Sequence, residues 1–113
     1  MPRTTKQTGK AESYREALLK SLSDPDEAAH YLNACLEDDD PGVFLLALRD
    51  VADAHGGVRA VSREAQLNRE SLYRMLSRSG NPSLDSLSAL LKACGLRLGV
   101  QSARGVSRRR RIA

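Results

Sequence analysis

Apolar residues recur every three or four positions along most of the chain, which predicts a succession of amphipathic helices. A short helix is expected over residues 13–22. Two longer helices each begin at an Asp–Pro pair, Asp24–Pro25 and Asp40–Pro41, in which the aspartate caps the helix and the proline suits its first turn. Gly56–Gly57 ends the second of these. The first half of the chain is therefore predicted to be helical.

The segment GVRAVSREAQLNRESLYRML, residues 57–76, spaces its apolar residues differently from the first half of the chain. It predicts two short helices separated by the tight turn AQLN, with Asn68 as the N-cap of the second helix. An apolar set has the spacing that two helices need to pack at a steep angle: Val61, Ala65, Leu67, Leu72 and Met75. This pattern is typical of a helix-turn-helix whose second helix enters the major groove of DNA.

The second of these helices has two unlike faces. Its outer side is predicted to carry Arg69, Glu70, Tyr73 and Arg74. An arginine there can bond the O6 and N7 atoms of guanine, and Glu70 can accept from cytosine N4 or orient a neighbouring arginine. The alternative is an ordinary helical hairpin with solvated charges. The pattern favours sequence-specific DNA binding.

The last third of the chain begins with the loop SRSGNPS, and Ser83 then caps a helix that Gly95 ends. The segment LRLGVQ that follows alternates, which predicts a short strand with its apolar side formed by Leu96, Leu98 and Val100. A lone strand is unstable, and its obvious partner is the same strand of a second copy, so we expect a homodimer. The N-terminal residues 1–12 and the tail 102–113 are expected to be disordered.

Composition limits the function classes. The 113 residues are enough for one compact domain plus tails. Two isolated cysteines indicate neither a disulfide nor a metal site, and no membrane span or secretory signal is visible, so we expect a cytoplasmic protein. His30 and His55 are isolated, and no phosphate loop or opposed carboxylate pair occurs. The sequence therefore predicts no enzyme, no cofactor and no metal.

Charge is divided unevenly along the chain. Residues 1–53 carry 6 basic and 11 acidic side chains, whereas residues 54–113 carry 12 basic and 3 acidic ones. The basic half contains the predicted helix-turn-helix, where positive charge favours DNA phosphates. The acidic run at residues 37–40 is either a surface for a basic partner or a solvated loop.

The basic half ends in a run of four arginines, Arg108, Arg109, Arg110 and Arg111. Such a run is a candidate electrostatic arm that binds nucleic-acid phosphates without reading bases. The alternative, a merely solubilising tail, stays open.

With these residues in view, the chain resembles the antitoxins of HigA type, described as probable addiction-module antidote proteins, within the Cro/repressor-like helix-turn-helix superfamily. The resemblance covers roughly residues 13–101. It is carried by SYREALL, DPDEAAHYLNACLEDDDPGVFLLALRDVADAHGG, LNRESLYRMLSRSGNPSLDSL and LLKACGLRL. Two positions depart from the family's usual pattern: Gln66 stands where the turn often has glycine, and Val58 where the first helix often begins with glutamine.

The resemblance implies an all-α fold of Cro/repressor (lambda repressor-like) type, with extra N-terminal helices. It implies that the protein neutralises a RelE/HigB-like ribonuclease toxin by direct binding and, as a dimer, represses its own operon by binding operator DNA. The implied base-reading positions are Arg69, Glu70, Ser71, Tyr73 and Arg74. Phosphate-positioning roles fall near Arg59, Ser77, Arg78 and Asn81, and Asn68, the expected cap of the second helix, is also expected to bind DNA.

We expect four parts: a tail over 1–12, a toxin-binding extension over 13–40, a DNA-binding domain with its dimerisation strand over 41–101, and a basic tail over 102–113. The residues expected to bind the toxin are Tyr31, Leu32, Leu36, Glu37, Asp38 and Asp39. Such toxins are typically basic, so an acidic surface is complementary. Two alternatives stay open: a stand-alone phage-type repressor, and a helical adaptor that does not bind DNA.

Overall fold

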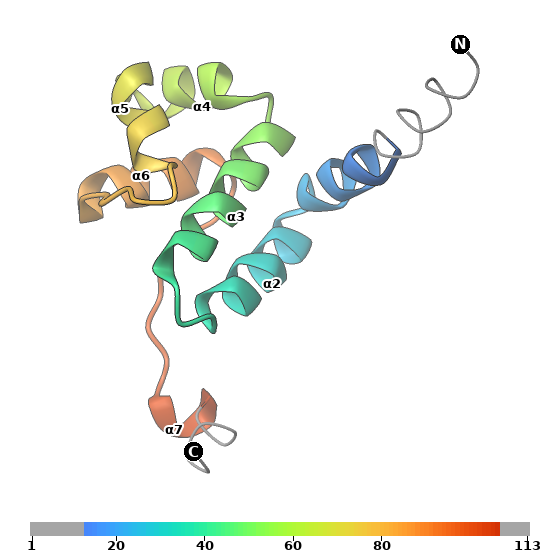
Figure 1. The fold of residues 1–113 in the computed structure, drawn as a ribbon, viewed down its shortest axis with the longest axis vertical. Helices are drawn as coiled ribbons and strands as arrows, with labels where there is room; N and C mark the ends of the chain where they lie inside the picture. The colour runs from blue at the N-terminus through green and yellow to red at the C-terminus, as the bar shows by residue number, and fades with distance from the viewer. Residues whose placement is uncertain (1–12, 107–113) are drawn as a thin grey trace.

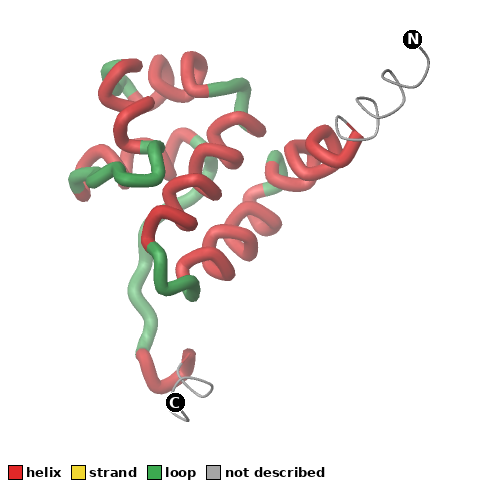
Figure 2. Tube along the Cα trace, viewed as in Figure 1, coloured by secondary structure: helices red, strands yellow, loops and turns green. Residues whose placement is uncertain are grey.

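The computed structural model of the chain describes residues 13–106, in which helices are joined by short loops and no β-strand occurs (Figure 2). A helix over residues 13–22 precedes those labelled in Figure 1. The labelled helices are α2 (Pro25–Leu36), α3 (Pro41–Ala54), α4 (Val58–Ala65), α5 (Arg69–Met75), α6 (Leu84–Ala93) and α7 (Ala103–Val106). The predicted all-α class is confirmed.

Side-chain caps start four of the helices where the sequence predicted them. Asp24 accepts a hydrogen bond from the Asp26 N–H at 3.1 Å, and Asp40 accepts one from the Gly42 N–H at 2.8 Å. The side chains of Asn68 and Ser83 accept from backbone N–H groups three residues further on, at 3.0 and 3.1 Å. Each bond satisfies a donor that the first turn of a helix leaves without a partner.

The helices form two parts that meet along α3. Figure 1 shows α2 and α3 as neighbours joined by the turn at residues 37–40, with α4, α5 and α6 gathered on the other side of α3. Helix α4 is central to this second group because it packs against α3, α5 and α6. Ser62 lies buried in α4, where its hydroxyl donates to the Arg59 carbonyl at 2.9 Å. A small side chain there lets the helices approach closely.

A single buried cluster joins both parts. Leu22, Ala28 and Leu32 belong to the same cluster as residues of α5 and α6, and its largest fully buried side chains are Leu22, Leu48, Leu72, Leu76, Leu90, Val51, Val61 and Cys94. The predicted functional division between residues 13–40 and 41–101 stays a prediction, but the two segments share their core.

The turn between α4 and α5 has the left-handed backbone that usually favours glycine. Gln66 adopts φ 58° and ψ 43° at the end of α4, and the Leu67 N–H donates to the Ser62 carbonyl at 2.9 Å. A side chain in this conformation costs about 1–2 kcal/mol. The turn therefore forms despite the absence of glycine, and packing of α4 against α5 offsets the strain.

The predicted C-terminal strand is not present in this single chain. Residues 96–101 follow α6 without regular secondary structure and lead to α7. A strand exists only through hydrogen bonds to a neighbouring strand, and the part of the chain that the structure describes contains none. Leu96 packs against the core, whereas Leu98 and Val100 are exposed. Of the three residues predicted to form the dimer interface, Leu96 therefore already packs against the core of its own chain.

Candidate nucleic-acid interface

Helix α5 separates polar and apolar side chains cleanly. Leu72, Met75 and the following Leu76 are buried, at 1%, 6% and 1% exposure. All five residues predicted to read bases are exposed on the opposite side: Arg69, Glu70, Ser71, Tyr73 and Arg74. This arrangement gives the protein a short helix that is buried on one side and has a polar outer face with two arginines.

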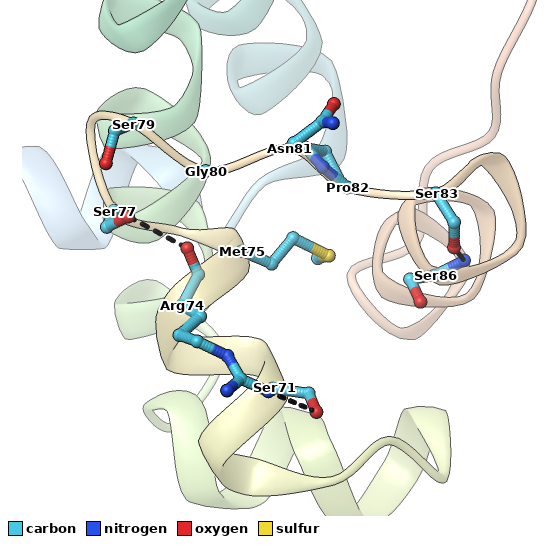
Figure 3. Close-up of a pocket in the computed structure, with 10 residues that line it drawn as sticks. All are labelled: Ser71, Arg74, Met75, Ser77, Ser79, Gly80, Asn81, Pro82, Ser83 and Ser86. Atoms are coloured by element: carbon cyan, nitrogen blue, oxygen red, sulfur yellow. Dashed lines mark hydrogen bonds between the residues drawn. The ribbon is translucent and has the colours of Figure 1, made fainter.

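A hollow of about 430 Å³ lies beside this face, between α5 and the start of α6. We call it the serine-lined hollow. Four predicted DNA-binding residues line it, namely Ser71, Arg74, Ser77 and Asn81, together with Met75, Ser79, Gly80, Pro82, Ser83 and Ser86 (Figure 3). Sequence reasoning missed Ser79, Ser83 and Ser86 as lining residues. The available signal is the serine-rich run SRSGNPSLDS, which by itself predicts only a loop and a cap.

Hydrogen bonds fix several of these side chains. The Arg74 guanidinium donates to the Ser71 hydroxyl at 3.4 Å, and the Ser77 hydroxyl donates to the Arg74 carbonyl at 2.8 Å (Figure 3). Ser83 uses its oxygen as the cap of α6. Hydroxyls, a side-chain amide and one guanidinium are groups that proteins use to contact phosphate oxygens.

Gly80 holds the loop of the hollow against the end of α5. Its N–H donates to the Ser77 carbonyl at 2.9 Å. A Cβ atom built on Gly80 would lie only 2.2 Å from the Met75 carbonyl oxygen and 2.7 Å from that of Arg74. The absence of a side chain is therefore what lets residues 80–82 pass so close to α5.

The structure does not bring every predicted DNA contact to this hollow. Arg59 is exposed on α4, and Asn68 is the cap of α5. Arg78 turns toward α3, where its guanidinium donates to the Asp40 carboxylate at 2.5 Å. The hydrogen bond from the Gly42 N–H, together with the Arg78 charge, holds the pKa of Asp40 below its usual value. Arg78 thus secures the loop after α5 to the start of α3.

Tyr73 is partly occupied by a contact that the sequence did not reveal. The Arg49 guanidinium of α3 lies over the Tyr73 ring, 5.2 Å from its centroid, while Tyr73 as a residue remains 46% exposed. Arg49 also approaches Asp53, with Nε and Oδ1 3.7 Å apart. Asp53 in turn accepts from Arg15 at 2.8 Å. A chain of charged contacts thus runs from the first helix through α3 to α5.

The predicted toxin-binding residues divide into two groups. Leu32 is buried at 5% exposure and is a core residue, so its assignment to a partner surface is corrected. Tyr31 is half-buried and its hydroxyl donates to Asp50 at 2.8 Å. Burial and this bond to a carboxylate raise the pKa of Tyr31 to about 12. The remaining predicted residues are exposed around the turn that ends α2: Leu36, Glu37, Asp38 and Asp39.

The predicted DNA arm falls outside the part of the chain that the structure describes. All four of its residues, Arg108, Arg109, Arg110 and Arg111, lie outside the described residues, so the structure neither confirms nor corrects their role. The candidate surface that the structure does describe is built from α4, α5 and the loop before α6.

No helix within residues 13–106 is long and apolar enough to cross a bilayer. The described part of the protein is defined by its helical fold, by the polar face of α5 with the adjoining hollow, and by an acidic turn between α2 and α3.

Comparison with known proteins places this arrangement in a family. Residues 10–102 match the family described as probable addiction module antidote protein, and the chain belongs to that family, whose members are antitoxins. An uncharacterized protein of Haemophilus influenzae is 36% identical over 83 residues, which are 74% of this chain and 84% of the relative. No solved structure matches the chain.

Proposed function

We propose that this antitoxin binds DNA through α4 and α5, as a helix-turn-helix of Cro/repressor type with α5 in the major groove. The observation that carries the proposal is the division of α5 into a buried apolar side and an exposed side with two arginines, which continues into the serine-lined hollow. A recognition helix needs an inner side that packs on the core of its domain and an outer side whose polar side chains can reach base edges.

Each part of the surface has a role in this proposal. Arg69 and Arg74 read guanine edges, and Glu70 orients an arginine or accepts from cytosine. The amide of Asn81 donates to a backbone phosphate oxygen, and so does the Ser77 hydroxyl when it turns away from the Arg74 carbonyl. These contacts set the register on the duplex. The proposal assigns the chain no catalytic chemistry.

A homodimer would present two copies of α5 to the DNA. Leu98 and Val100 are exposed apolar residues on one side of the segment 96–101, which can form an antiparallel ladder with its counterpart in a second copy. A two-fold dimer places its recognition helices about one DNA turn apart, roughly 34–36 Å. The operator would accordingly be palindromic, and the dimer would repress the operon that encodes it.

The toxin partner in this proposal is a RelE/HigB-like ribonuclease. A protein that binds RNA presents positive charge, and the turn at the end of α2 offers carboxylates beside the exposed Leu36. Glu37, Asp38 and Asp39 then lie at the edge of the contact with the toxin. The toxin would then leave the outer face of α5 free for DNA.

Fluorescence anisotropy tests the DNA proposal with duplex DNA from upstream of the protein's own coding region. Arg69→Ala and Arg74→Ala should each weaken specific binding by about 1–3 kcal/mol. The matched control is Lys20→Ala, which removes an exposed cation from the first helix and should bind like the parent. If the parent does not bind, or if all three variants bind equally well, α5 does not read DNA and the adaptor alternative gains support.

Neutralisation is tested separately, because a stand-alone repressor would bind DNA equally well. The neighbouring gene should encode a small basic protein whose toxicity the chain suppresses on co-expression. A chain with Asp38→Asn and Asp39→Asn should suppress it less well. If no toxic neighbour exists, the stand-alone repressor is the better description.

A further inference from the structure

An apolar groove with an acidic rim lies where α2, α3 and α6 meet. Its volume is about 580 Å³. The apolar walls include Leu36, Phe44, Pro82 and Leu87, and Asp38 and Asp39 also line it. We call this the acidic groove. Leu36 is 56% exposed, so the groove presents apolar surface to solvent right beside negative charge. Such a surface fits a segment that carries both cations and an apolar side chain.

The carboxylates of the rim differ in what they already bind. Asp40 is committed to the fold, since it caps α3 and pairs with Arg78. Asp38 accepts a hydrogen bond from the Asp40 N–H at 2.8 Å, which holds it at the turn. Among residues 13–106, neither Asp38 nor Asp39 forms an ion pair with a cation. Two neighbouring negative charges therefore remain available for a basic ligand.

The chain carries a segment of matching chemistry. Residues 107–113, which follow α7, read SRRRRIA, with four consecutive arginines and then Ile112. Figure 1 places α7 at the end of the molecule's long axis that lies nearest the turn between α2 and α3. Seven extended residues reach about 23–25 Å. The segment thus follows a helix at the end of the molecule nearest this turn.

We propose that residues 107–113 dock in the acidic groove of their own chain, with arginines against Asp38 and Asp39 and Ile112 on the apolar wall. Exposed ion pairs are individually weak, but tethering gives the segment a high effective concentration. Docking is therefore reversible and sensitive to salt. A basic partner that binds the rim has to displace the segment, which frees four arginines for DNA.

Backbone amide NMR of the full chain tests this proposal without toxin or DNA, so its result is independent of the proposed function. The test variant has all four arginines of 108–111 changed to Gln. Amide signals of Leu36, Asp39 and Phe44 should shift in this variant. The matched control, with all three cations of residues 1–10 changed to Gln, should leave them in place. In about 1 M salt the Debye length is about 3 Å, so ion pairs between the segment and the groove are screened. The parent's signals should then move toward those of the test variant.

The reverse experiment changes the groove. In a chain with Asp38→Asn and Asp39→Asn, amide signals of residues 108–112 should move to their high-salt positions, while the Leu48 signal stays fixed and reports an intact core. The proposal is overturned if the groove signals are the same in the parent and the test variant. It is also overturned if their differences vanish on dilution, because the groove would then hold the tail of a second copy.

Discussion

Replacing Gly80 with alanine should destabilise the protein and disturb the serine-lined hollow together. The added Cβ would lie 2.2 Å from the Met75 carbonyl oxygen and 2.7 Å from that of Arg74, whereas favourable contact begins at roughly 3.5 Å. Both oxygens belong to the backbone of α5, so neither can rotate away. The loop has to move by about an ångström, and overpacking of this kind costs about 1–3 kcal/mol.

Thermal unfolding followed by far-UV circular dichroism measures this cost. For a domain of this size, each kcal/mol lowers the melting temperature by about 4–8 °C, so Gly80→Ala should lose roughly 4–24 °C. The control is Gly99→Ala, because a Cβ there meets nothing within 4 Å and should leave the melting temperature unchanged or slightly raised. A Gly80→Ala protein that melts with the parent would refute the packing of this loop on α5. Its DNA affinity should fall as well, since residues 80–82 line the hollow.

Three further outcomes are expected. Tyr31→Phe should cost about 1–2 kcal/mol in urea unfolding by removing the bond to Asp50. Because the pKa of Tyr31 is about 12 in the fold and 10.0 ordinarily, its contribution is complete below pH 10 and is lost as the pH rises through 12, so the parent should lose stability there more steeply than the variant. Gln66→Gly should gain about 1 kcal/mol by relieving the left-handed backbone, and an unchanged denaturation midpoint would contradict this. Leu98→Pro should shift sedimentation toward monomer, and an undiminished dimer would place the interface elsewhere, such as on α6.

Features that depend on nearby residues could be predicted from the sequence. The caps at Asp24, Asp40, Asn68 and Ser83 hydrogen-bond N–H groups two or three residues away, so a short stretch of sequence contains the whole interaction. The two faces of α5 follow from helical spacing alone. The same local rules place the ends of α3 and α6 at their glycines, where Gly56 and Gly95 have positive φ.

Features that depend on distant residues could not be predicted in this way. The contact of Arg49 with Tyr73 and the pair between Arg78 and Asp40 join residues far apart in the chain. Helical periodicity places Leu32 on the apolar side of α2. It cannot show whether that side is covered by the protein's own core or by a partner. The strand predicted over residues 96–101 is absent for the same reason. Alternation within these residues says nothing about whether a neighbouring strand is present to pair with them.

The fold pairs some charges of the acidic half with arginines and leaves other charges exposed. Asp53 is paired with Arg15 and Arg49, and Asp40 with Arg78, so part of the acidic half is neutralised where it meets α5 and its loop. The pair with Asp40 also removes Arg78 from the charges that are free to bind phosphate. Arg74 lines the hollow, where its guanidinium bonds the Ser71 hydroxyl, and within residues 13–106 it forms no ion pair with a carboxylate. Arg74 rather than Arg78 should therefore dominate the attraction of this surface for DNA, although the helical pattern predicts a DNA-binding role for Arg74 and the family resemblance implies one for Arg78.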